Sequence, residues 1–150
     1  MPLRLVLDTN SVLALWLFHD PRLAALKSWV EAGAATLHCR DDALEELRRV
    51  LAYSQFAATP ETQAAILAAY RSRVCIVPGP LETAMTLPEC RDRDDQKFLE
   101  IARDAAATHL LTRDKILLKL ARHRLVRDHF AILTPERFLD AMQPDSAARQ

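Results

Sequence analysis

The sequence predicts an α/β domain built around a mainly parallel sheet of short strands. Short apolar runs recur along the chain, and they alternate with longer segments in which apolar residues have the spacing of a helix with one buried face. Residues that start and end helices mark the boundaries between these segments. Strands that alternate with helices in this way favour parallel pairing, because each helix returns the chain to the same end of the sheet.

The expected strands are few and short. They are residues 3–7, 35–38, 74–77, 109–111 and 130–133. Helices are expected over residues 11–18, 21–32, 41–53, 60–71, 94–107, 115–123 and 135–142. Asp20 followed by Pro21 is typical of a helix start, and Gly33 is typical of a helix end. We therefore expect one domain over residues 1–142 and a frayed tail over residues 143–150.

The composition is that of a globular domain with no overall electrostatic attraction to nucleic acid. The chain has 150 residues, of which 50% are hydrophobic and 27% charged, and its 20 acidic residues balance its 20 Lys and Arg residues. This length suffices for a sizeable core. Any binding of nucleic acid must therefore come from local patches of positive charge.

Several classes of protein are excluded or disfavoured. The three cysteines are widely spaced, which argues against a disulfide framework or a zinc site and favours a reducing cytoplasm. Two glycines cannot form a Gly-rich phosphate loop. Neither a signal peptide nor a membrane span is expected, because no apolar stretch has the required length and flanks.

Two aspartates follow expected strands at equivalent places. Asp8 comes directly after residues 3–7, and Asp114 ends the sequence LLTRD, which begins in the strand 109–111. Sites of α/β proteins form at the carboxyl ends of the strands. Each aspartate also has a simpler explanation as the N-cap of the next helix, although Asn10 and Ser11 could cap the first helix equally well.

The helix expected over residues 41–53 offers two glutamates. Glu45 lies opposite the apolar stripe of this helix, where Arg49 could pair with it. Glu46 lies at the margin of the stripe, from which a side chain can reach into a cleft. Glu46 is therefore the better candidate for a site, although a surface charge is the simpler explanation for either residue.

Three aspartates surround the start of the helix expected over residues 94–107. Acidic side chains favour helix N-termini as caps or through the helix dipole, so one of the three is expected to be a cap. Asp95 projects near the apolar face that carries Phe98, and Asp94 also lies close to that face. Helical geometry alone does not choose between Asp94 and Asp95.

Taken together, Asp8, Glu46, Asp95 and Asp114 suggest a site for a divalent cation. Mg²⁺ and Mn²⁺ bind through carboxylate oxygens, and clustered carboxylates without a cation raise one another's pKa. If the four side chains converge, we expect them to hold one or two Mg²⁺ or Mn²⁺ ions, which support hydrolysis of phosphodiesters. Spacing in the sequence does not prove this convergence.

The order of VLDTN, EELRRVL, DRDDQKFLEIA and LLTRD resembles that of the PIN-domain ribonucleases. It is most similar to the subgroup of toxins from toxin–antitoxin pairs, and the resemblance runs from residue 3 to about residue 139. It implies a three-layer α/β/α sandwich with a parallel sheet of about five strands. It also implies metal-dependent RNA cleavage that leaves 3′-hydroxyl and 5′-phosphate ends, with Asp8, Glu46, Asp95 and Asp114 as the catalytic, metal-binding acids.

The resemblance also implies supporting roles beside those acids. Asn10 matches the polar residue of the first motif, Thr112 matches the hydroxyl partner of the last acid, and Asp92 matches a further acid. One departure concerns the helix 41–53, which usually opens with serine in the family, whereas HCRDD stands there in this chain. This departure removes no acid and affects only how the helix is capped or contacts substrate.

Basic residues that could receive RNA gather in residues 113–127, which carry six Lys and Arg residues and one acid. A solvated helix face is the simpler explanation of this segment, but a site of four acids needs positive groups around it to bind RNA. The candidates are Arg113, Lys115, Arg40 and Arg91. No aromatic stacking platform is evident in the sequence, so sequence-specific reading of bases is not expected.

The partners expected besides RNA are a second copy of the chain and a small antitoxin protein. The helices near the N-terminus are rich in Ala and Leu and carry Trp16 and Trp29, so part of their apolar surface could remain exposed. The resemblance to the toxin subgroup supports the same expectation.

Two other classes of function stay open at this stage. The first is a catalytically silent RNA-binding or assembly module of the same fold. The second, less favoured, is a phosphoryl-transfer domain that uses Asp8 as its nucleophile. The D-x-D pattern of the aspartate-nucleophile phosphatases is absent, because Asn10 stands at the second position of that pattern.

Overall fold

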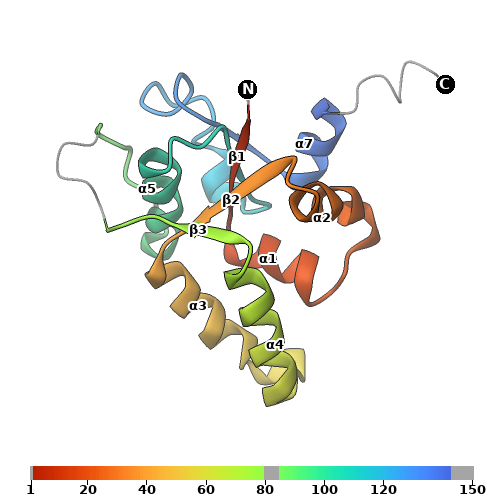
Figure 1. Ribbon diagram of the computed structural model, residues 1–150. Coiled ribbons are helices and arrows are strands. Elements are labelled where there is room, and N and C mark those ends of the chain that lie inside the picture. Colours follow the sequence, from red (N-terminus) through yellow and green to blue (C-terminus); the bar gives the residue numbers. More distant parts are fainter. Residues whose placement is uncertain (1, 80–84, 143–150) are drawn as a thin grey trace.

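A five-stranded, all-parallel sheet forms the centre of the fold (Figure 1). The computed structural model describes residues 2–79 and 85–142. Its strands are β1 (Leu3–Leu7), β2 (Ala35–Cys39), β3 (Val74–Ile76), β4 (His109–Leu111) and β5 (Ala131–Leu133), in the spatial order β3-β2-β1-β4-β5. The predicted parallel sheet of five short strands is confirmed.

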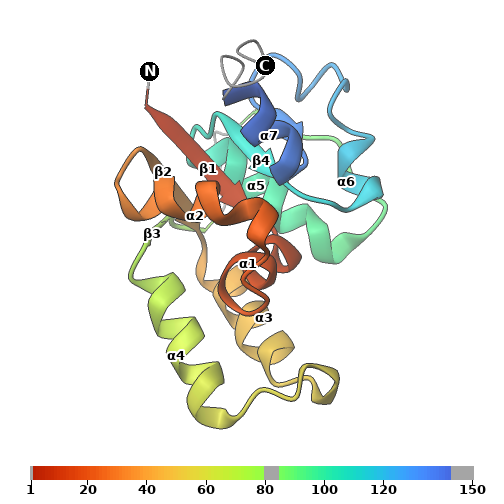
Figure 2. The same cartoon turned by 90° about the vertical axis from the view of Figure 1, so that its right-hand side faces the viewer.

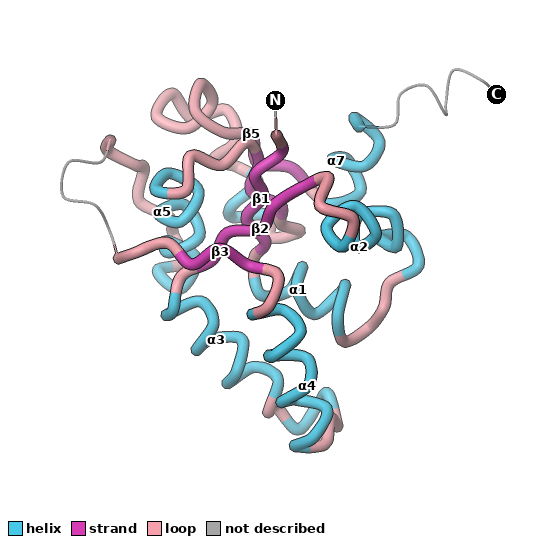
Figure 3. Tube along the Cα trace, in the orientation of Figure 1, coloured by secondary structure: helices cyan, strands magenta, loops and turns pink. Residues whose placement is uncertain are grey.

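Helices cover both faces of this sheet and complete a three-layer α/β/α sandwich. They are α1 (Thr9–Trp16), α2 (Ala24–Glu31), α3 (Asp41–Leu51), α4 (Pro60–Arg71), α5 (Gln96–Asp104), α6 (Lys115–Leu118) and α7 (Pro135–Met142). On one face, α5 packs against β1, β2 and β4, while α2 and α7 pack together on the other face (Figures 1 and 3). The predicted fold class is therefore correct.

A second group of helices lies beyond the carboxyl ends of the strands. There α3 packs against α4, and α1 contacts both of them (Figure 2). Since β1 lies between β2 and β4, the chain runs outward to β3 and then crosses to β4 on the other side of β1. The carboxyl ends of β1 and β4 thus lie side by side at the point where the direction of winding reverses, which is the usual place for a site in a sheet of this kind.

The core is formed by the central strands and the inner faces of the helices. Leu5 of β1 and both leucines of β4 have no exposed surface, and α5 buries Phe98 and Leu99 against them. Trp16 is also a core residue, and Trp29 packs against the core and is partly buried. The expectation that the Trp-bearing helices leave an apolar patch exposed is therefore wrong for Trp16.

Several helix boundaries differ from the predicted ones. The first helix begins at Thr9 rather than at Ser11, because the side chain of Asp8 caps it. Residues 93–95 form a separate 3-10 turn before α5. The helix predicted over residues 115–123 ends at Leu118 and is followed by turns.

Two predictions fall partly outside the described residues. The frayed tail over residues 143–150 lies outside them, and the single domain over residues 1–142 therefore stays a prediction. No helix within residues 2–79 and 85–142 is long and apolar enough to cross a membrane.

Candidate active site

The four predicted acids line one cavity at the carboxyl ends of β1 and β4. The cavity has a volume of about 290 Å³. Asp8 follows β1, Asp114 follows β4, Glu46 comes from α3, and Asp95 ends the turn before α5. Four separate elements thus bring carboxyl groups to one place, as the sequence suggested.

Asp8 is a buried helix cap as well as part of the cavity wall. The residue is only 4% exposed, and its Oδ1 accepts a hydrogen bond from the backbone N–H of Ser11 at 2.9 Å. Asp8 itself, rather than Asn10 or Ser11, therefore caps α1. Burial raises the pKa of Asp8, and the hydrogen bonds from Ser11 and Thr112 oppose this rise.

The hydroxyl of Thr112 joins the two strand-end aspartates. It donates to Oδ2 of Asp8 at 2.5 Å and accepts from the backbone N–H of Asp114 at 2.9 Å. Thr112 has no exposed surface. The predicted partner of Asp114 thus contacts the backbone of that residue and the carboxylate of Asp8.

Asp114 also has two roles in the structure. Its Oδ1 accepts a hydrogen bond from the backbone N–H of Ile116 at 2.8 Å, so Asp114 caps α6, as the simpler explanation predicted. The same side chain lines the acidic cavity. Capping and a position in the site are compatible, because a cap uses only one of the two oxygens.

Asp95 is the acid that most clearly lacks a compensating charge. Its Oδ2 is buried, and no donor among the described residues gives it a hydrogen bond. Burial, and after it the neighbouring Asp114 carboxyl, raise the pKa of Asp95 to about 7. The folded protein therefore holds a proton on Asp95 to a higher pH than an exposed aspartate does.

The other two aspartates near α5 lie differently. Asp92 caps the 3-10 turn, because its Oδ1 accepts from the backbone N–H of Asp94 at 3.0 Å. The expectation that one aspartate of the three is a cap is thus correct. Asp92 and Asp94 are exposed, although both line the cavity, whereas Asp95 is half-buried and has a buried Oδ2 atom.

Glu46 has two partners that the sequence did not reveal. The hydroxyl of Thr9 donates to its Oε2, and Nζ of Lys97 lies 3.0 Å from its Oε1. Thr9 adjoins Asp8 in the sequence and could have been considered for that reason, whereas nothing in the sequence separates Lys97 from other helix cations. Glu45 instead pairs on the surface with Arg48, not with Arg49 as expected.

The donor set of this cavity fits a hard divalent cation. Carboxylate oxygens are the ligands that Mg²⁺ and Mn²⁺ prefer, and one buried oxygen of Asp95 has no hydrogen-bond partner among the described residues. In the side-chain positions of this structure, no group of three Asp, Glu, His or Cys residues within 2–79 and 85–142 is close enough together to hold an ion. Asp8, Asp95 and Asp114 are the best candidates to do so after adjustment, because Glu46 already has a cation beside it.

The predicted RNA-binding residues occupy different environments. Arg113 forms ion pairs with Asp20 at 2.9 Å and with Glu136. Lys115 and Arg91 are exposed. Neither Arg113 nor Lys115 lines the acidic cavity, although both adjoin Asp114 in the sequence.

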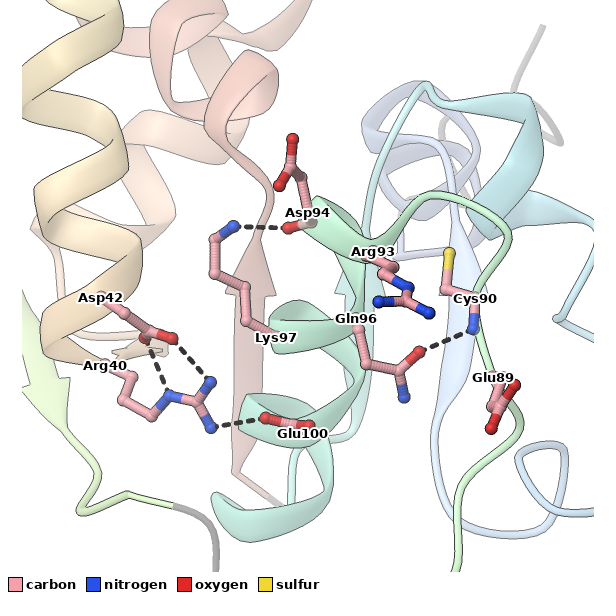
Figure 4. A pocket seen from close by; sticks show the side chains of 9 residues that line it. All are labelled: Arg40, Asp42, Glu89, Cys90, Arg93, Asp94, Gln96, Lys97 and Glu100. Atoms are coloured by element: carbon pink, nitrogen blue, oxygen red, sulfur yellow. Dashed lines mark hydrogen bonds and ion pairs between the residues drawn. The ribbon is translucent and has the colours of Figure 1, made fainter.

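Arg40 lies in a neighbouring cleft of about 490 Å³ that shares Asp94 with the acidic cavity (Figure 4). Its guanidinium pairs with Asp42 at 2.7 Å and with Glu100 at 2.9 Å, and the residue is buried. Figure 4 shows Arg40 between these two acids, so its charge is already balanced within the protein.

Comparison with known proteins gives one match. The profile of a protein family described as PIN domain matches residues 4–116, a range that contains all four acids. No curated protein sequence and no solved structure gives a significant match to the chain.

Proposed function

Because the chain belongs to the PIN-domain family, whose members are generally nucleases, we propose that it is a divalent-metal-dependent endoribonuclease. The observation that carries this proposal is the single cavity lined by carboxyl groups from four separate elements. Asp8, Glu46, Asp95 and Asp114 are the proposed catalytic and metal-binding residues. Asn10, Asp92 and Thr112 are proposed to support them.

The proposed division of labour follows from the contacts of each side chain. Asp8, Asp95 and Asp114 would hold Mg²⁺ or Mn²⁺, and Thr112 fixes the orientation of Asp8 through its hydroxyl. When bound, such an ion supplies positive charge against the phosphate and activates water. Thr9 and Lys97 hold the side chain of Glu46 in place.

Positive charge outside the cavity would receive the RNA backbone. Lys115 and Arg91 are exposed and available for phosphate, and they are the stronger candidates for this role. Arg113 and Arg40 are the weaker ones, because acidic side chains already pair with both.

The biological role proposed here is that of a toxin in a toxin–antitoxin pair. The resemblance of the four motifs to that subgroup supports this role, and with it a small inhibitory antitoxin, a homodimer and a cytoplasmic location. A buried Trp16 removes one argument for an exposed apolar surface on the N-terminal helices, so these partners rest on the resemblance alone.

A pair of adjacent glutamates gives a direct test of the proposed activity. A labelled RNA is incubated with Mn²⁺ and the wild-type protein, the Glu46→Gln variant or the Glu45→Gln variant. Wild type and Glu45→Gln are expected to cleave the RNA, because Glu45 is exposed and, among the described residues, forms an ion pair with Arg48 alone. Glu46→Gln is expected to lose most of this activity, and excess EDTA should abolish it in every sample.

Two results would count against the proposal. If wild type binds RNA in Mn²⁺ but leaves it intact, the protein is a silent RNA-binding module of the same fold. If Asp8→Asn retains both Mn²⁺ binding, measured by calorimetry, and cleavage, the acidic cavity is not the active site.

A further inference from the structure

Three aromatic side chains meet beside the acidic cavity. Phe18 and Tyr53 are 58% and 52% exposed, and they are two of the three large apolar side chains that are exposed in the described part of the chain. Tyr53 and Phe56 line the same cavity as the four acids. We call Phe18, Tyr53 and Phe56 the aromatic platform.

The rings of this platform support one another. The rings of Tyr53 and Phe56 are parallel to within 8°, with their centroids 6.3 Å apart. Phe18 packs edge-on against Phe56, with centroids 5.7 Å apart and an angle of 67° between the ring planes. Phe56 is thus held between the other two rings, and the platform presents large exposed aromatic surfaces at the edge of the cavity.

Exposed rings of this kind indicate a binding partner. Three side chains provide far less area than the roughly 1,200–2,000 Å² that a stable protein interface buries. A nucleotide suits the site better, because it joins a flat aromatic base to a phosphate, and the platform and the carboxyl groups share one cavity. Bases of single strands can stack on aromatic side chains, whereas the faces of bases within a duplex are already covered.

We propose that Phe18, Tyr53 and Phe56 form a stacking subsite for an unpaired nucleobase next to the phosphate that the acidic cavity receives. This inference rests on the proposed nuclease function and assigns the residues that would hold a base of its substrate. The sequence did not suggest such a platform, because Phe18 lies far from Tyr53 and Phe56 along the chain and only the fold brings it to them.

The test measures base-dependent binding separately from cleavage. A fluorescent single strand with phosphorothioate linkages, which resist hydrolysis, is titrated with the protein in Mn²⁺. The same strand without bases and the corresponding duplex are titrated in parallel. The variants are Tyr53→Leu, which removes a ring, and Tyr53→Phe, which keeps one. Ile76→Ala serves as the matched control, because it truncates the third exposed apolar side chain, which does not line the acidic cavity.

Tyr53→Leu is expected to weaken binding of the single strand roughly 5- to 150-fold, which is the loss of affinity that corresponds to one base–aromatic stack. Tyr53→Phe and Ile76→Ala should bind as wild type does. The abasic strand and the duplex should bind wild type weakly and should not respond to Tyr53→Leu.

Equal binding of the abasic and normal strands would overturn the proposal, and so would equal weakening of single strand and duplex by Tyr53→Leu. A change of self-association in Tyr53→Leu without any change in strand binding would assign the platform to a protein partner instead. Failure of the nuclease proposal is distinguishable, because wild type would then leave ordinary RNA intact while its base-dependent binding could still be measured.

Discussion

The ammonium of Lys97 lies 3.0 Å from Oε1 of Glu46, so one of the four cavity acids already has a cation beside it. Both side chains are largely buried, at 14% and 18% exposed. Lys97 also donates to the backbone carbonyl of Asp94 and lies 5.2 Å from the centre of the Phe98 ring. Within residues 2–79 and 85–142, the other three acids have no such ion pair, so the charge of Glu46 is balanced by a neighbouring cation and theirs is not.

Replacement of Lys97 by methionine should strengthen binding of Mn²⁺ several-fold. The substitution removes a positive charge that repels a cation from the cavity, and it leaves Glu46 with the Thr9 hydroxyl as its remaining partner. Calorimetric titration with Mn²⁺ measures the change. The folded state should also lose stability, because a largely buried carboxylate loses its partner.

Lys115→Met provides the control for that substitution. Lys115 is exposed and does not line the cavity, so its loss should leave the affinity for Mn²⁺ close to the wild-type value. Weaker Mn²⁺ binding in Lys97→Met would contradict the prediction and would mean that the ion needs Glu46 to be held by the lysine.

The Thr112→Val substitution should destabilise the protein although it preserves the shape of the side chain. Two buried polar groups lose their partner at once, namely Oδ2 of Asp8 and the backbone N–H of Asp114. Each group left unpaired costs about 1–3 kcal/mol of unfolding free energy. Chemical denaturation measures this loss, and Thr112→Ser, which keeps the hydroxyl, should stay near wild type. Similar stability of the two variants would show that the bridge contributes little.

Two substitutions at Asp114 should separate its cap from its place in the cavity. Asparagine is as good an N-cap as aspartate, so Asp114→Asn should keep nearly all the stability while Mn²⁺ binding falls sharply. Asp114→Ala should lose Mn²⁺ binding and about 1 kcal/mol of stability as well. Calorimetry and urea denaturation measure the two properties. Full Mn²⁺ binding by Asp114→Asn would leave Asp114 as a cap alone.

Asp95 should contribute stability to the metal-free protein that is lost as the pH rises from about 4 to about 7. The pKa of Asp95 is raised from 3.8 to about 7 by burial and by the neighbouring Asp114 carboxyl, so the folded state keeps a proton that the unfolded chain has lost. Below this range both states carry the proton, and above it neither does. Urea denaturation in EDTA at pH 5 and pH 8 measures the difference.

The Asp95→Asn variant should lose less stability than wild type between these two pH values. Asp94→Asn, an exposed neighbour, should behave as wild type does. Mn²⁺ should restore stability at pH 8 in wild type, because a ligand that binds only the folded state stabilises it. An identical pH dependence in wild type and Asp95→Asn would refute this explanation.

The strands and their acids were predictable because both depend on short stretches of sequence. The apolar run before Asp8 predicts a strand, and the end of a strand predicts where its next side chain lies. Glu46 could be distinguished from Glu45 by its position around the helix axis, because Glu46 lies at the margin of the apolar stripe and Glu45 lies opposite it. These inferences need no knowledge of which elements are neighbours, and the structure brings the predicted residues into one cavity.

The contacts between distant segments were not predictable in the same way. Lys97 reaches Glu46 only because α5 packs against the sheet beside α3, and Phe18 reaches Phe56 only because the chain after α1 passes the end of α3. The early end of α6 at Leu118 was not predictable from the apolar spacing either. In the turns that follow α6, the side chain of His123 accepts a hydrogen bond from the backbone N–H of Leu125.

Because the chain builds the sheet first on one side of β1 and then on the other, the protein could be divided into two fragments that meet at the acidic cavity. Asp8 and Glu46 come before β3 along the chain, whereas Asp95 and Asp114 come after it. Two separate polypeptides divided after β3 would each carry half of the acids, and neither would have a complete cavity. The proposed RNA cleavage would then depend on reassembly of the two fragments, so the fold lends itself to a split protein whose activity reports an encounter between its halves.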